Sequence, residues 1–164
     1  MRPVADPSSH RLGNPLRLKI TLGNILHGRL NNGVYRAGFA TTQEAYDEAV
    51  GPLFDTLDWL EDRLSSRRFL TGEEITEADW RLFTTLIRFD PVYVGHFKCN
   101  IRRIADYPRL SDYMRTLFRI EGVATTVDFG HIKRHYYQSH RNLNPSGIVP
   151  AGPELAFVSR GAAE

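Results

Sequence analysis

The chain has 164 residues, enough for one domain with a hydrophobic core, and its 41% apolar content excludes an intrinsically disordered chain. A formal net charge of +2 is too small to indicate a nucleic-acid-binding protein, and the single cysteine, Cys99, excludes an internal disulfide framework. No apolar run is long enough to span a bilayer or to form a signal peptide, so we expect a cytoplasmic protein without a membrane partner.

The first third of the chain predicts a short lead-in followed by one helix. Residues 1–15 are rich in proline, serine, glycine and asparagine and are expected to be irregular. From residue 16 to residue 30 the apolar positions fit a helix. Asn31-Asn32-Gly33 is expected to end it, because these residue types tolerate left-handed backbone.

A longer helix is predicted next. Thr41 and Glu44 have the spacing of a capping box, in which each side chain bonds a backbone N–H at the other position. The apolar residues that follow recur at spacings of three and four: Tyr46, Val50, Leu53, Leu57, Leu60 and Leu64. Gly51-Pro52 lies within this stripe and predicts a kink.

The start of the third helix is the clearest local signal. Residues 70–81 read LTGEEITEADWR, and Thr76 and Asp79 are placed as a capping box, with Ile75 and Trp80 as a hydrophobic staple. The polar stripe after Thr76 is narrow, which is typical of the central helix of a bundle. Asp90-Pro91 is expected to bend or end this helix, and residues 93–97 are expected to be irregular.

Two further helices complete the pattern. One begins at Tyr107-Pro108 and stops near Glu121-Gly122, and the last extends from about Asp128, a plausible N-cap, to Ser139. Because no strand pattern is found, we predict an all-α bundle of about five or six helices. The helical domain should cover residues 16–140, with an irregular C-terminal extension over 141–164.

Several segments resemble one known family. ITEADW at the start of a buried helix resembles the glutathione transferase C-terminal domain. The segments 31–46, 78–100, 103–108 and 131–140 resemble the glutathionyl-hydroquinone reductases, the xi-class glutathione transferases, and NPSGIVPAGP resembles their C-terminal extension. The resemblance extends from about Leu30 to Pro153. It implies a helical bundle of the glutathione transferase C-terminal type and a homodimer.

The resemblance also implies a reaction. Glutathione would be removed from an S-glutathionyl hydroquinone by a cysteine in a Cys-Pro-Trp motif, and a second glutathione would resolve the mixed disulfide. In the family, that cysteine and most of the glutathione site belong to a thioredoxin-like N-terminal domain. These 164 residues contain no Cys-Pro-Trp, and Cys99 is followed by asparagine. We therefore expect the chain alone to lack the nucleophile and to need that domain in cis.

Two tyrosines match the catalytic pair that the resemblance implies, Tyr35 in GVYRAGF and Tyr136 in RHYY. A tyrosine can pack against an aromatic leaving group and give it a hydrogen bond or a proton. Tyr136 extends the apolar face of the last helix, and Tyr35 is expected in a glycine-bracketed loop. The residues alone favour two packing tyrosines whose hydroxyls are satisfied; the resemblance favours a site role.

Three other residues are candidates for substrate binding. Tyr93 follows the Pro91 bend, where it can line the same cavity, whereas Tyr137 falls on a different face from Tyr136. His135 is a candidate for acid–base chemistry or anion contact, with an ordinary surface or packing role as the simpler alternative.

We predict no metal site. His131 and His135 are four residues apart, and His96 and Cys99 are three apart, spacings that can in principle hold zinc. There is no paired CxxC motif, and the resemblance implies no metal.

Two hypotheses for function follow. In the first, the chain is the hydroquinone-binding half of a glutathionyl-hydroquinone reductase, with glutathione as co-substrate and an exposed apolar face for the thioredoxin-like domain. In the second, it is a non-catalytic binding or dimerisation module of the same fold.

Overall fold

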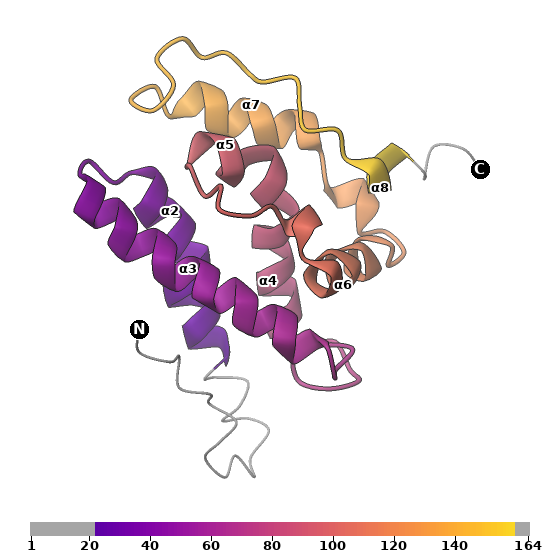
Figure 1. Ribbon diagram of the computed structural model, residues 1–164. Coiled ribbons are helices and arrows are strands. Elements are labelled where there is room, and N and C mark those ends of the chain that lie inside the picture. The colour runs from indigo at the N-terminus through magenta and orange to yellow at the C-terminus, as the bar shows by residue number, and fades with distance from the viewer. Residues whose placement is uncertain (1–21, 160–164) are drawn as a thin grey trace.

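The computed structural model describes residues 22–159, which contain helices and no strand (Figure 1). The prediction of an all-α fold is therefore confirmed over this part of the chain. The predicted lead-in over 1–15 and the start of the first helix lie outside the described residues. After helical residues 22–25, the elements are η1 (Leu26–Asn31), α2 (Asn32–Gly38), α3 (Gln43–Leu64), α4 (Glu77–Arg88), η2 (Phe89–Tyr93), α5 (Val94–His96), η3 (Ile104–Asp106), α6 (Pro108–Phe118), η4 (Ala124–Thr126), α7 (Phe129–Ser139) and α8 (Ala156–Ser159).

The long helix α3 and the preceding helix α2 lie side by side, while α7 and the segment after it cover another part of the bundle (Figure 1). Between them lies α4, which contacts both η1 and α6 and is prolonged by η2 toward α7. The prediction that this helix is central is therefore confirmed.

The first helix does not end where the sequence predicted. Helical backbone continues through Asn31 and Gly33 to Gly38, because the π-helical η1 leads directly into α2. Asn31 accepts a hydrogen bond from the Thr85 hydroxyl at 2.8 Å, and this tertiary contact outweighs its tolerance for a turn. Tyr35 consequently lies on a helix and not in the expected loop.

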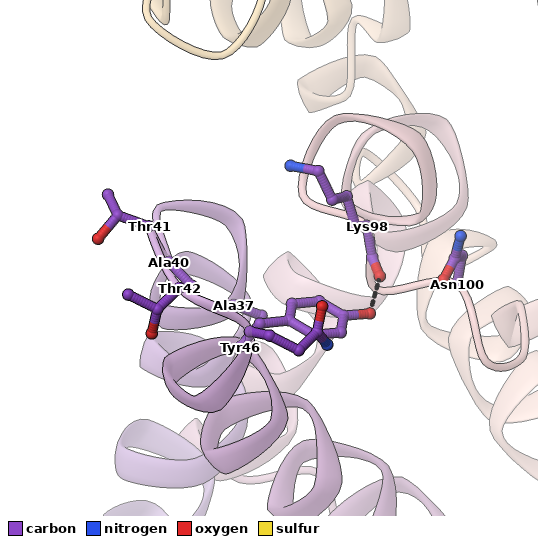
Figure 2. A pocket seen from close by; sticks show the side chains of 8 residues that line it. Ala37, Ala40, Thr41, Thr42, Tyr46, Lys98 and Asn100 are labelled. Carbon is purple, nitrogen blue, oxygen red and sulfur yellow. Dashed lines mark hydrogen bonds between the residues drawn. The ribbon is translucent and has the colours of Figure 1, made fainter.

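The N-cap of α3 is Thr42, one residue after the predicted Thr41. The Thr42 hydroxyl accepts from the Ala45 N–H at 3.2 Å, so the predicted capping box with Glu44 is wrong by one position. Pro52 lies inside α3 without ending it. Near the start of α3, the Tyr46 hydroxyl donates to the Lys98 carbonyl at 2.7 Å, which fastens the helix to the segment after α5 (Figure 2).

The start of α4 is organised by Asp79, whose side chain is fully buried. The predicted capping box with Thr76 is present, and the Thr76 N–H and hydroxyl donate to Asp79 Oδ2 at 2.7 and 2.9 Å. The other oxygen, Oδ1, accepts from the Leu70 N–H at 2.9 Å and from the Tyr113 hydroxyl at 2.8 Å. One carboxylate thus joins α4 to the preceding loop and to α6.

The chain remains helical after α4. We expected residues 93–97 to be irregular, but η2 and α5 continue the helix through His96. A π-helical turn around Pro91 accommodates a residue that has no N–H to donate. Asp90 is used elsewhere, since its carboxylate accepts from the Ile104 N–H at 2.6 Å and from the Ala105 N–H at 3.1 Å.

The later helices follow the sequence more closely. Pro108 is at the first position of α6, which ends at Phe118, and Asp128 caps α7 by accepting from the His131 N–H at 2.8 Å. The extension is irregular only in part, because α8 packs Phe157 against Phe118 and Phe129. Within residues 22–159, no helix is long and apolar enough to cross a membrane.

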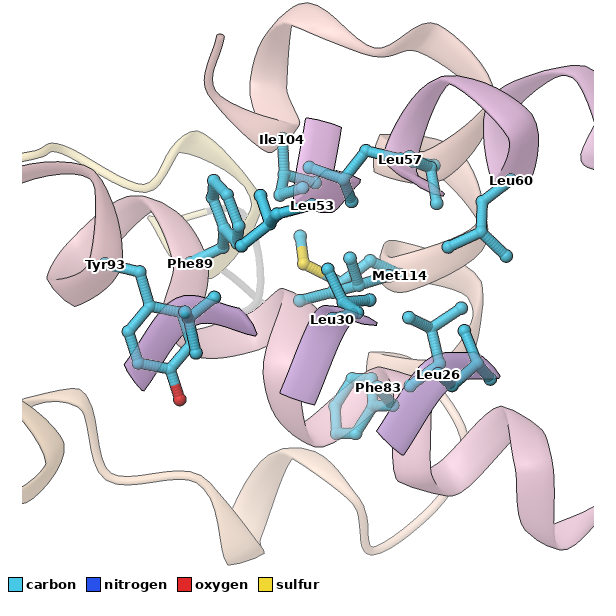
Figure 3. Close-up of a cluster of buried hydrophobic side chains, with 14 of the residues drawn as sticks. Leu26, Leu30, Leu53, Leu57, Leu60, Phe83, Phe89, Tyr93, Ile104 and Met114 are labelled. Carbon is cyan, nitrogen blue, oxygen red and sulfur yellow. The ribbon is translucent and has the colours of Figure 1, made fainter. Parts of the chain in front are cut away.

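The core joins the first helix to the stripe on α3. Leu53, Leu57 and Leu60 are buried with Leu26 and Leu30, as the predicted spacing of the α3 leucines requires (Figure 3). Other members come from α4, η2, η3 and α6, and include Phe83, Phe89, Tyr93, Ile104 and Met114.

We expect Asp79→Asn to lower the free energy of unfolding by about 2–4 kcal/mol. An amide has one acceptor oxygen, and its NH₂ group would face donors that the carboxylate now satisfies. Urea denaturation measures the change. Glu77→Gln, in the same helical turn but exposed, is the matched control and should leave stability nearly unchanged. Equal stability of the two variants would contradict the role of Asp79.

Gly38 ends α2 directly against the buried Phe97. A Cβ at Gly38 would clash with the ring of Phe97, so we expect Gly38→Ala to displace that ring and cost about 1–3 kcal/mol of stability. Gly28→Ala is the control, because a Cβ there meets nothing within 4 Å and the substitution should be neutral or slightly stabilising. A Gly38→Ala variant as stable as Gly28→Ala would show that the contact is not restrictive.

Candidate functional site

Three of the predicted site residues meet in one place. Tyr35 on α2, Tyr93 in η2 and Tyr136 on α7 bring their hydroxyl groups together, although 101 residues separate Tyr35 from Tyr136. The Tyr136 hydroxyl lies 2.6 Å from that of Tyr35 and 3.1 Å from that of Tyr93. We call these three residues the tyrosine chain, with Tyr136 in the middle.

The tyrosine chain leads from the interior to the surface. Tyr93 is 3% exposed and Tyr136 is 6% exposed, whereas Tyr35 is 39% exposed. A molecule approaching from solvent would therefore reach Tyr35 first.

Burial keeps the two inner tyrosines protonated. It raises the pKa of Tyr136 to about 12, and the hydrogen bond with Tyr35 acts in the same direction. Burial also raises the pKa of Tyr93 far above its ordinary value, with Tyr136 as the next cause. At neutral pH both groups are neutral phenols, which donate hydrogen bonds and do not serve as bases.

The other two predicted residues lie outside the tyrosine chain. His135 is exposed and places its ring edge-on to that of Tyr136, with the ring centres 5.3 Å apart. Tyr137 is buried on another side of α7, where its ring packs on His96 at 4.6 Å. Of the five predicted residues, three are thus joined by hydrogen bonds, one is adjacent and one packs elsewhere.

Phe97 lies at the centre of the aromatic groups, and sequence reasoning did not single it out. Its fully buried ring is 5.2–5.8 Å from six others: the inner rings of Tyr93 and His96, and the rings of Tyr35, Phe39, Tyr136 and His140. We call the last four, Tyr35, Phe39, Tyr136 and His140, the Phe97 rim. The sequence did contain a signal for the rim. Tyr35 and Phe39 are four residues apart, and so are Tyr136 and His140, a spacing that places each pair on one helix face.

One member of the rim, His140, is paired with a second histidine. His96 Nε2 lies 3.1 Å from His140 Nδ1, and the two rings are stacked. His96 is 7% exposed, and burial, aided by His140, lowers its pKa to about 4. His96 is therefore uncharged at neutral pH. This pairing was also missed from the sequence, because the two histidines belong to different helices.

Neither a reactive thiol nor a metal site is found among the described residues. Cys99 is fully buried, and burial raises its pKa to about 12, so its thiol stays protonated and unreactive at neutral pH. Among residues 22–159, no three histidine, cysteine or acidic side chains are grouped so that they could hold a metal ion.

An open cavity of about 410 Å³ lies on another side of α2 (Figure 2). It is lined by Ala37, Ala40, Thr41, Thr42, Gln43, Tyr46, Lys98 and Asn100. None of the five predicted site residues is among these, so the cavity and the tyrosine chain are separate features.

Comparison with known proteins shows which family the helical bundle resembles. The family model for the glutathione S-transferase C-terminal domain matches residues 43–116. A curated relative, the glutathionyl-hydroquinone reductase PcpF of Sphingobium chlorophenolicum, is 64% identical over 124 residues, which are 76% of this chain and 40% of that protein.

Solved structures show the same fold. The glutathione-bound structure of YqjG, a glutathione transferase homolog from Escherichia coli K-12, is 51% identical with a TM-score of 0.83, covering 85% of this chain and 45% of that one. A xi-class glutathione transferase from Natrialba magadii is 46% identical with a TM-score of 0.85, covering 88% of this chain and 45% of that one. This chain thus spans less than half the length of these proteins. These matches confirm the predicted fold and identify the helical part of this chain as a glutathione transferase C-terminal domain of the kind found in glutathionyl-hydroquinone reductases and xi-class glutathione transferases.

Proposed function

We propose that this chain is the hydroquinone-binding half of an enzyme that reduces S-glutathionyl hydroquinones with glutathione. The observation that carries the proposal is the tyrosine chain, a line of three phenols that opens to solvent at Tyr35. The high identity with a protein named glutathionyl-hydroquinone reductase supports it. Action in the cytoplasm and as a homodimer are parts of the same proposal.

The reaction assigns separate tasks to two halves of the enzyme. A thiolate on a thioredoxin-like half attacks the glutathione sulfur of the substrate, forming a mixed disulfide as the bond between that sulfur and the aromatic carbon breaks. The electron pair of the broken bond passes to the ring, and the ring carbon takes a proton to give the hydroquinone. A second glutathione attacks the mixed disulfide, restores the thiolate and leaves as oxidised glutathione.

The helical half would hold the aromatic ring and stabilise the charge that develops on it. Three hydroxyl groups possess three protons, and the two hydrogen bonds of the tyrosine chain use two of them. When Tyr93 donates to Tyr136 and Tyr136 donates to Tyr35, the Tyr35 proton is left for a ligand. The two buried phenols then strengthen Tyr35 as a donor, because successive hydrogen bonds polarise one another.

The surface beside Tyr35 suits contact with both a ligand and a second domain. Tyr35 lies on α2, Phe39 is the C-cap residue of the same helix, and each exposes more than a third of its surface. Exposed aromatic side chains grouped in this way are typical of binding surfaces. We propose that the thioredoxin-like half adjoins this face and that the substrate lies between the two halves.

The buried thiol of Cys99 favours one alternative. Because its raised pKa leaves no reactive thiolate among the described residues, the chain alone would act as a non-catalytic binding or dimerisation module.

We expect this chain, joined to the segment of YqjG that precedes the matched region, to reduce S-glutathionyl hydroquinone. Tyr35→Phe should lower kcat/KM by about 10²–10³, since it removes the one donor that faces the substrate. Steady-state rates measure the effect. Tyr137→Phe makes the same chemical change outside the tyrosine chain and should retain nearly full activity.

The unjoined chain is a further control, for which we expect no turnover. Turnover by the chain alone that Cys99→Ser abolishes would contradict the assignment of the nucleophile to another domain. Equal rates for Tyr35→Phe and Tyr137→Phe in the joined protein would contradict the role of the tyrosine chain.

A further inference from the structure

His140, the C-cap residue of α7, lies beside the exposed part of the tyrosine chain. It follows Tyr136 by four residues, and the two rings meet edge to face with centres 5.6 Å apart. Across the rim its ring centre is 5.0 Å from that of Phe39, the C-cap residue of α2, also edge to face. Two helices therefore each bring an aromatic pair to the same spot, Tyr35 with Phe39 and Tyr136 with His140.

The His140 ring is held from behind. Its Nδ1 atom is hydrogen-bonded to Nε2 of the buried His96 at 3.1 Å, and its ring stacks on Phe97 with an interplanar angle of 18°. Since Phe97 is fully buried and His140 is half-buried, the imidazole has one face against the core and a part of its surface toward solvent. A ring fixed in this way can act as a wall for a flat ligand, because little side-chain freedom is lost on binding.

We infer that His140 is a specificity-determining residue of the hydroquinone site, forming with Phe39 the wall against which the substrate ring packs while Tyr35 holds a substrate hydroxyl. This inference rests on the function proposed above. The other members of the rim are phenylalanine and tyrosine. His140 is the member whose ring can gain a positive charge.

The charge of this wall depends on pH. Burial lowers the pKa of His140 from its ordinary value of 6.5, and the neighbouring His135 acts in the same direction. The wall is therefore neutral at pH 7.5 and gains positive charge only as the pH falls below that ordinary value. Three titratable groups contact or act on His140 directly: His96, Tyr136 and His135. The others act through these three, since Tyr35 and Tyr93 are hydrogen-bonded to Tyr136, Tyr137 packs on His96, and the charge of Lys98 acts on His96.

A cation beside the ligand should favour a ring that carries a carboxylate. We expect the 164-residue chain to bind hydroquinone and 2,5-dihydroxybenzoate, with tyrosine NMR signals of the rim shifting during titration. Between pH 7.5 and pH 5, the affinity for 2,5-dihydroxybenzoate relative to hydroquinone should rise about threefold to tenfold, the range expected for a partly exposed ion pair.

Two substitutions separate the ring from the charge. His140→Phe keeps a flat ring, so hydroquinone affinity should stay within about twofold while the pH-dependent preference disappears. His140→Asn keeps a polar group near His96 but removes the ring, so hydroquinone affinity should fall about threefold to tenfold. Two other histidines of α7 are controls, and both His131→Phe and His135→Gln should retain the pH-dependent preference.

The outcomes that overturn the inference are distinct. A His140→Phe variant that keeps the pH-dependent preference shows that the charge arises elsewhere, and a His140→Asn variant with wild-type affinity shows that His140 is no wall. In a third outcome, hydroquinone binds, Tyr35→Phe weakens this binding, and neither His140 variant differs from wild type in affinity or pH dependence. The assignment of His140 then fails while the proposed function stands. If the wild-type chain binds neither probe, both fail.

Discussion

The buried carboxylate of Asp79 is the interaction on which the arrangement of this domain depends. Four hydrogen bonds converge on it, from Leu70, from the backbone and hydroxyl of Thr76, and from Tyr113. They fix where α4 begins and how it lies against α6. Because α4 continues without a break through η2 and α5, its start also sets the position of Tyr93 at the other end of the helical run. A polar contact far from the tyrosine chain thereby helps to place it.

The candidate site is formed where three helical runs approach one another. The first run ends at Gly38, the second at His96 and the third at Ser139, and each contributes one tyrosine to the hydrogen-bonded chain. Two of the runs contain π-helical turns, η1 before Tyr35 and η2 around Tyr93. A π-turn changes the direction in which later side chains point, and such turns are frequent at functional sites. The missing side chain of Gly38 lets α2 close on Phe97, which then touches every member of the rim.

The sequence predicted the elements whose signals are local. The capping box at Thr76, the proline at the start of α6 and the N-cap at Asp128 each act within one helical turn, and all are present in the structure. The errors arose where tertiary contacts override local preference. Asn31 remains helical because its side chain bonds Thr85, and residues after Pro91 remain helical because a π-turn absorbs the proline.

The site itself was only partly predictable. Tyr35, Tyr93 and Tyr136 were found through family resemblance and position, although Tyr35 was expected in a loop. Phe97 was missed because its segment was interpreted as irregular, and the pairing of His96 with His140 joins residues 44 positions apart that no periodicity connects. Contacts between distant helices depend on how the helices pack, which single-helix patterns do not contain.

The central claim is that Tyr136 acts through Tyr35, as the middle of one hydrogen-bonded chain with a single outward proton. A double-mutant cycle on the joined protein tests it most directly, comparing kcat/KM for Tyr35→Phe, Tyr136→Phe and the double variant. We predict strong non-additivity, with the double variant little slower than Tyr35→Phe alone. Losses that simply add would contradict it, because they would show that the two hydroxyls act independently.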